Sequence, residues 1–127
     1  MLNTLRFGIE IETVGLGREG LANAIQSVVG GTKIADYRRW KIVDAKGRSW
    51  RVVPDGSLSG GEQSGEIVSP VLGYDDIDEL QQVVRAVRSA GARSDQSCGI
   101  HYALVVVMRE RACLCLDLKD YHSEACA

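Results

Sequence analysis

The sequence lacks long apolar runs and carries little excess charge of either sign. Its longest uninterrupted apolar stretch, residues 103–108, falls far short of the roughly 18 residues that a membrane-spanning helix requires. The 15 Lys and Arg are balanced by 17 Asp and Glu, so the basic surplus typical of nucleic-acid-binding domains is missing. Residues 1–4 do not resemble the start of a secretory signal. These absences predict a cytoplasmic protein that spans no membrane and binds no nucleic acid.

Paired metal-binding and nucleophile motifs are also missing. The four cysteines lie in the last third of the chain without any C-x-x-C spacing, and no disulfide framework is expected. Cys113 and Cys115 with His122 and Cys126 leave a zinc site as an alternative, but ordinary reduced thiols are the main prediction. The glycines form neither a phosphate loop nor a dinucleotide fingerprint, and no serine has a nucleophile-elbow context.

What is present is a chain of 127 residues, 45% hydrophobic, which is enough for one globular domain over residues 1–127. Period-2 and period-3.6 patterns of apolar residues alternate along it. The order of the expected elements predicts an α+β fold: a mostly antiparallel sheet with two helices on one face. The expected elements are a strand at 5–13, a helix at 21–29, a hairpin of 40–44 with 49–53, a strand at 66–69, a helix at 76–91 and a central strand at 100–107.

The second expected helix has the clearest boundary signals. Asp76 can cap it, Glu79 lies three residues later as in a capping box, and Gly91 can end it. Helical spacing predicts one buried stripe, made of Ile77, Leu80, Val83, Val84 and Val87.

Two glutamates share one side of the first expected strand. Glu10 and Glu12 are two residues apart, which places their carboxylates about 7 Å apart on the face that the helices leave open. Carboxylates held this close repel each other, which either raises a pKa or recruits a cation. The simpler alternative is that both are solvated side chains on an exposed face.

Further candidate ligands lie in other parts of the chain. Glu66 begins a short strand, and Asp55 and Glu62 flank the preceding glycine-rich loop. These acids could converge with the first strand on one divalent cation, and His101 could complete a second metal position. A histidine alone in an apolar strand can also be a satisfied core residue.

A series of short motifs, taken together, resembles a known family. The sequence is similar to the amidoligase family, a distant relative of glutamine synthetase and glutamate–cysteine ligase, over most of its length. The motifs that carry the resemblance, in order, are Phe7-Gly8-Ile9-Glu10-Ile11-Glu12-Thr13, Asp55-Gly56-Ser57-Leu58, Gly65-Glu66-Ile67-Val68-Ser69-Pro70, Gly91-Ala92 and Ser97-Cys98-Gly99-Ile100-His101.

The resemblance implies a glutamine-synthetase-like catalytic half and an ATP-dependent ligase that joins a carboxylate to an amine, such as those of peptides, through an acyl-phosphate. It also implies two Mg²⁺ ions, because a triphosphate and a carboxylate must approach each other despite their charges. Members occur in bacteria and phages. The implied ligands are Glu12, Glu66 and Asp55 for one ion, and Glu10 with His101 for the ion near the terminal phosphates.

Some features depart from the family pattern. Ala103 replaces the second histidine of the family motif. Ser57, by contrast, fits the resemblance and is expected in the loop beside the substrate. The resemblance fades after about Arg109, and residues 111–127 form an atypical tail, which predicts a truncated member. The alternative function is therefore a non-catalytic module that binds a peptide or protein, with a homo-oligomer covering an open sheet edge after Val107. A metallohydrolase using the same acids is a third possibility.

Overall fold

The computed structural model describes residues 5–56, 60–108 and 112–117, with side chains as far as residue 100. It confirms the predicted α+β class. Within the described residues, no helix has both the length and the apolar character needed to cross a membrane. The strands and helices are β1 Leu5–Val14, α1 Arg18–Val29, β2 Thr32–Asp36, β3 Arg39–Val43, β4 Ser49–Val53, β5 Ser64–Val68, β6 Leu72–Gly73, α2 Ile77–Ser89, β7 Ile100–Met108 and β8 Ala112–Asp117, with short 3₁₀ turns η2 Gly61–Gln63 and η3 Tyr74–Asp76.

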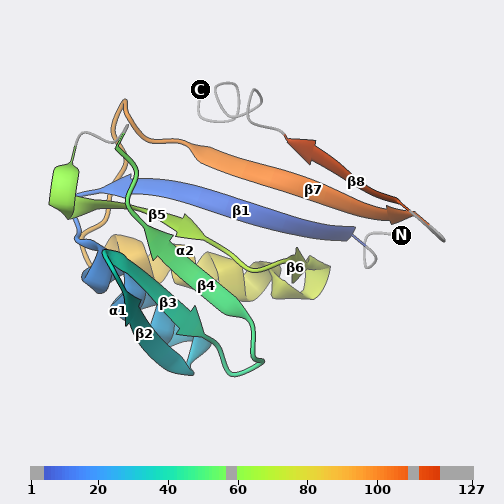
Figure 1. Cartoon of the computed structure of the whole chain (residues 1–127), viewed down its shortest axis with the longest axis horizontal. Coiled ribbons are helices and arrows are strands. Elements are labelled where there is room, and N and C mark those ends of the chain that lie inside the picture. The colour runs from blue at the N-terminus through green and yellow to red at the C-terminus, as the bar shows by residue number, and fades with distance from the viewer. Residues whose placement is uncertain (1–4, 57–59, 109–111, 118–127) are drawn as a thin grey trace.

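One antiparallel sheet forms the framework of the molecule (Figure 1). Its strand order is β2-β3-β4-β5-β1-β7-β8, and the short β6 pairs with one end of β1. β1, the first strand of the chain, therefore lies between β5 and β7 and is hydrogen-bonded on both edges. Its alternating pattern suits this position, because one side of the strand faces the core and the other carries polar groups.

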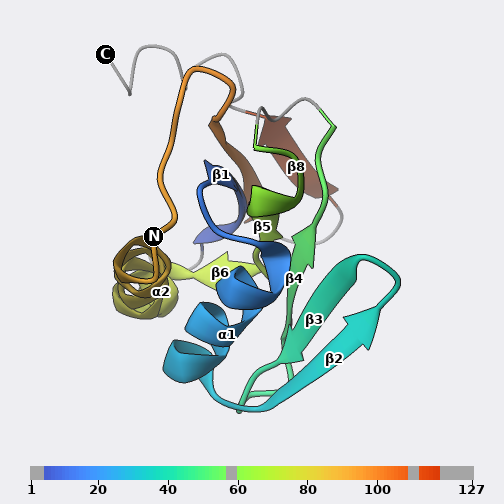
Figure 2. The ribbon, with the colours of Figure 1, turned by 90° about the vertical axis from the view of Figure 1, so that its left-hand side faces the viewer.

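Both helices lie on the same side of the sheet, as predicted (Figure 2). α1 packs under β2–β5 and against α2. Its buried residues follow the expected helical spacing, and the helix ends at Gly30, whose φ of 71° is available to glycine at little cost. The core between helices and sheet contains Leu21, Ile25, Ile42, Trp50, Val52, Ile67, Leu72 and Val83, all fully buried.

The strand β2 was not predicted from the sequence. It forms a tight hairpin with β3, in which Asp36 pairs with Arg39 and the two central residues, Tyr37 and Arg38, both have positive φ. Neither residue type signals such a turn, which usually contains Asn or Gly. β2 is also mostly exposed and at the sheet edge, so it lacks the apolar alternation of a buried strand.

The predicted capping box of α2 is wrong. Asp76 makes no side-chain capping bond to α2; its Oδ2 instead accepts a hydrogen bond from the Gly73 amide at 2.7 Å, one turn earlier. Glu79 accepts from Arg48 Nη2 at 3.0 Å rather than reaching back to the helix start. The predicted stripe holds only in part, because Val83 and Val87 are buried whereas Val84 is 40% exposed.

Arg48 joins the β3–β4 hairpin to the start of α2. Its guanidinium bonds to Asp44 at 3.1 Å and to Asp76 at 2.9 Å. Burial alone would raise the pKa of Asp44, but hydrogen bonds from Arg48 and Trp50 lower it, so this buried carboxylate remains charged. The network fixes the hairpin whose second strand, β4, leads to Asp55.

The sheet continues past β7. β8 pairs with β7 from Ala103–Asp117 to Met108–Ala112, so the edge that was expected to be open after Val107 is occupied by the same chain. The expectation of an exposed β7 edge is therefore wrong. The predicted homo-oligomer stays a prediction, but an open β7 edge no longer supports it.

Candidate functional site

Acidic residues gather on the sheet face opposite the helices. Glu12 pairs directly with Glu66 across β1 and β5, and Glu10 pairs with Val68 one step along the same strands. Residues that are directly opposite in an antiparallel pair point to the same side. The core residues Ile11 and Ile67 point the other way, toward the helices. Glu10, Glu12 and Glu66 therefore share the open face.

Asp55 joins this face from the connection after β4. The strand β4 ends with Val53 directly opposite Glu66, and Asp55 follows two residues later. One carboxylate oxygen from each of Glu12, Asp55 and Glu66 lies within 4.8 Å of the other two. All three side chains are partly buried. We call these three residues the carboxylate triad.

The triad is electrostatically strained. Partial burial, the charge of Glu10, a hydrogen bond to Asp55 and the charges of Asp55 and Glu12 together raise the pKa of Glu66 to about 7. Without a counterion, a Glu66 with this pKa is partly protonated near neutral pH, and its protonated form shares a hydrogen bond with Asp55. Three acids brought together by a central strand pair, with no Lys or Arg of the described chain bonded to Glu66, form a site that favours positive charge.

The donor set fits a hard divalent cation. Carboxylate oxygens are the ligands that Mg²⁺ and Ca²⁺ prefer, and Mg²⁺ commonly uses one or two carboxylates, with water or phosphate oxygens completing its shell. Oxygens within 4.8 Å of one another can surround one such ion after small side-chain adjustments. A cation would also relieve the repulsion that raises the pKa of Glu66.

The structure places the other predicted site residues as follows. Glu10 is exposed and outside the triad, and the residue opposite it on β7 is His101. The side chain of His101 lies outside the described part of the structure, as does Ser57. Glu62 lies in η2, is exposed, and is not part of the triad. The assignment of Glu10 and His101 to a second ion thus stays a prediction.

Two basic residues on the same face were not recognised from the sequence. Lys41 on β3 and Arg51 on β4 are directly opposite each other. Arg51 is also opposite Val68, whose position on β5 is two residues from Glu66. Alternation within 39–43 and 49–53 could have placed both on the open face, but only the strand order shows that they lie near the triad.

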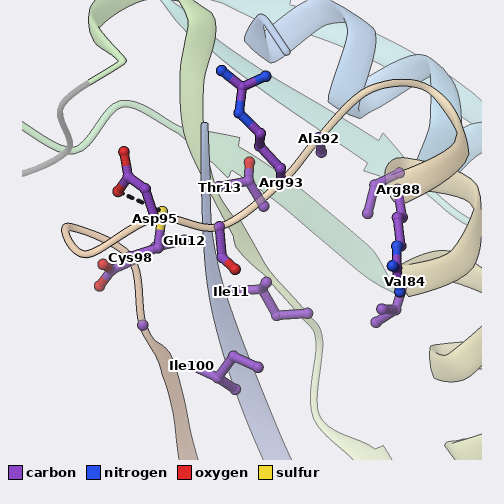
Figure 3. A pocket seen from close by; sticks show the side chains of 13 residues that line it. Ile11, Glu12, Thr13, Val84, Arg88, Ala92, Arg93, Asp95, Cys98 and Ile100 are labelled. Atoms are coloured by element: carbon purple, nitrogen blue, oxygen red, sulfur yellow. Dashed lines mark hydrogen bonds between the residues drawn. The ribbon is translucent and has the colours of Figure 1, made fainter. Parts of the chain in front are cut away.

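A cavity of about 510 Å³ lies between β1, the end of α2 and the 92–99 connection (Figure 3). Ile11, Val84 and Ile100 contribute to its largely apolar wall, and Glu12 is the one triad residue that lines it. Cys98, at its edge, is a free thiol whose pKa is raised by burial, so it is protonated at neutral pH. The side chains of the three later cysteines lie outside the described residues, so the expectation of reduced thiols stays a prediction.

The fold and the acidic face define the chain as an α+β protein that concentrates carboxylates on the open side of an antiparallel sheet. The family model described as "Putative amidoligase enzyme" matches residues 3–104 of the 127, and the chain belongs to this family of ligase-type enzymes. Comparisons with curated proteins and with solved structures give no significant match.

Proposed function

We propose that the protein is an ATP-dependent carboxylate–amine ligase that acts in the presence of Mg²⁺. The carboxylate triad is the observation that carries this proposal, because family membership alone names a ligase without a mechanism. Three acids on a sheet face suit a reaction in which anionic groups must be brought together.

The proposed reaction has two steps. A substrate carboxylate attacks the γ-phosphorus of ATP, giving an acyl-phosphate and ADP; an amine then attacks the acyl carbon, phosphate leaves, and the amine loses a proton. Glu12, Asp55 and Glu66 would hold a divalent cation, which supplies charge neutralisation for the phosphates. These side chains bring no reacting atom of their own to the substrate; their contribution is to position charge.

The proton on Glu66 gives the site a second property. Because its pKa is about 7 through burial and the neighbouring acids, the triad is less negative in the absence of a cation than three free carboxylates would be. Binding a cation would release this proton, so cation affinity should rise with pH through about 7. Glu10, whose charge contributes to this shift, would extend the acidic face toward a second ion next to His101.

Isothermal titration with Mg²⁺ and a non-hydrolysable ATP analogue tests the proposal. The wild type and the control Glu62→Gln, which removes an exposed acid outside the triad, should bind the analogue when Mg²⁺ is present. Glu12→Gln and Glu66→Gln should bind it at least about tenfold more weakly. Absence of binding by the wild type at millimolar nucleotide would refute the ligase proposal and leave the non-catalytic peptide- or protein-binding module as the better explanation.

A further inference from the structure

A second hollow lies on the open face of the sheet, apart from the triad. It has a volume of about 450 Å³ and is lined by Lys41, Ser49, Arg51, Ser69, Pro70 and Val71. Its basic side comes from β3 and β4, and its apolar rim from the turn after β5, where Val71 is 60% exposed. A hollow with two cations on one side and an apolar rim on the other suits a ligand that has an anionic group and a less polar body.

The positive charges of Lys41 and Arg51 lie directly opposite each other on neighbouring strands. Lys41 and Arg51 are a directly opposed cross-strand pair, and like charges in that arrangement destabilise a sheet. Both basic residues of the turn between these strands are paired: Arg48 with Asp44, Asp76 and Glu79, and Lys46 with Asp76. Lys41 and Arg51 form no such ion pair with the described residues. An oxyanion between them would remove their repulsion and accept their donors.

The hollow and the triad are close enough for one ligand to reach both. Arg51 precedes Val53 by two residues, and Val53 is directly opposite Glu66. Arg51 therefore lies about 7 Å along the sheet and one strand spacing of about 5 Å across it from Glu66, and Lys41 lies one strand spacing farther. A cation at the triad and the basic pair would then form two positive centres on one acidic sheet face.

We propose that Lys41 and Arg51 form an oxyanion subsite that holds a second anionic group of the ligand whose first anionic group lies at the triad. This inference rests on the proposed function, since the triad is assumed to face the ligand through a cation. The oxyanion is either a nucleotide phosphate or a second carboxylate of the acid substrate. Both have the oxygen geometry that a guanidinium and an ammonium bind.

Two probes distinguish these sources: inorganic tripolyphosphate and glutarate, each titrated calorimetrically at pH 8 in the presence of Mg²⁺. The variants are Lys41→Gln and Arg51→Gln, both at exposed positions where folding should be unaffected. The matched control is Arg85→Gln, which removes one exposed positive charge from α2 on the other side of the sheet. Circular dichroism of each variant checks the fold.

The subsite predicts that one probe binds the wild type, and that each variant weakens that probe about five- to tenfold, with the Arg85→Gln control within about twofold. A loss confined to tripolyphosphate assigns the subsite to nucleotide phosphate, and a loss confined to glutarate assigns it to a substrate carboxylate. Equal losses in Arg85→Gln, no loss in either variant, or no binding of either probe would overturn the inference.

A parallel titration with Mn²⁺ alone separates this inference from the proposed function. If the wild type binds Mn²⁺ at the triad but Lys41→Gln and Arg51→Gln bind both probes normally, the subsite is wrong and the cation site stands. If no Mn²⁺ binds but the two variants still lose a probe, Lys41 and Arg51 form an anion site independent of the triad; the link to the triad is then wrong and the cation-dependent ligase proposal fails.

Discussion

Replacing Glu66 by glutamine should stabilise the cation-free protein at alkaline pH. Folding raises the pKa of Glu66 from 4.5 to about 7, through burial and the neighbouring acids, so the folded protein holds this proton more tightly than the unfolded chain does. The stabilisation of the folded state that comes from this tightly held proton is fully present below pH 4.5 and is lost as the pH rises through about 7. At pH 8 the ionised Glu66 is therefore a cost to folding.

The magnitude follows from the shift. The full shift in the pKa of Glu66 corresponds to slightly more than about 3 kcal/mol of unfolding free energy. We take roughly 2–3 kcal/mol, because the carboxylates are only partly buried and solvent screens their repulsion. A glutamine amide can donate to Asp55 as the protonated acid does, without becoming charged. The melting temperature of Glu66→Gln at pH 8 should exceed that of the wild type by roughly 6–12 °C, and the two should be nearly equal at pH 4.5.

Differential scanning calorimetry in a chelator-containing buffer at pH 4.5 and pH 8 measures both differences. Glu62→Gln is the control, because it removes an acid of the neighbouring turn without touching the triad, and it should shift neither value by more than about 2 °C. If Glu66→Gln is not stabilised at pH 8, or is stabilised equally at both pH values, the reasoning from clustered carboxylates is refuted.

Three further predictions concern the cation and the supporting fold. Mg²⁺ should raise the melting temperature of the wild type at pH 8 but not that of Glu66→Gln; an equal rise in both would place the ion elsewhere. Arg48→Met should destabilise the protein by about 2–4 kcal/mol in urea denaturation, because the Asp44 carboxylate stays buried without its ion-pair partner. The control Lys46→Met, at an exposed position, should cost less than about 1 kcal/mol. Gly31→Ala should lower the free energy of unfolding by about 3 kcal/mol or more, because the added Cβ would lie 1.8 Å from the Val43 carbonyl oxygen. The control Gly47→Ala, which has a similar φ but open space around the Cβ, should lower it by roughly 1–2 kcal/mol. Equal losses in the two variants would contradict this steric argument.

Apolar periodicity identified the elements that bury one face. β1, α1 and the hairpin of β3 and β4 were predicted correctly because each alternates between core and solvent. β2 was missed because an exposed edge strand needs no apolar face. The predicted capping of α2 was wrong for two reasons. Asp76 accepts from the Gly73 amide at the start of the preceding 3₁₀ turn, and Glu79 is held by Arg48, which is 31 residues away in the sequence and is not visible in helix signals.

The acidic face depends on strand order, which periodicity does not determine. Alternation could place Glu10 and Glu12 on one side of β1, but only the pairing of β5 with β1 brings Glu66 opposite Glu12. Asp55 follows a different strand, and its approach to the triad depends on the path of the chain after Val53. The basic pair Lys41 and Arg51 was not predicted either, because its position near the triad also depends on the strand order.

Electron paramagnetic resonance of free Mn²⁺ at pH 8 tests most directly whether the triad holds a divalent cation. The wild type and Glu62→Gln should each bind Mn²⁺ and release it to excess Mg²⁺, and Glu12→Gln and Glu66→Gln should bind it at least about tenfold more weakly. Wild-type protein that leaves all Mn²⁺ free at millimolar concentration, or triad variants that bind as tightly as the wild type, would contradict the account.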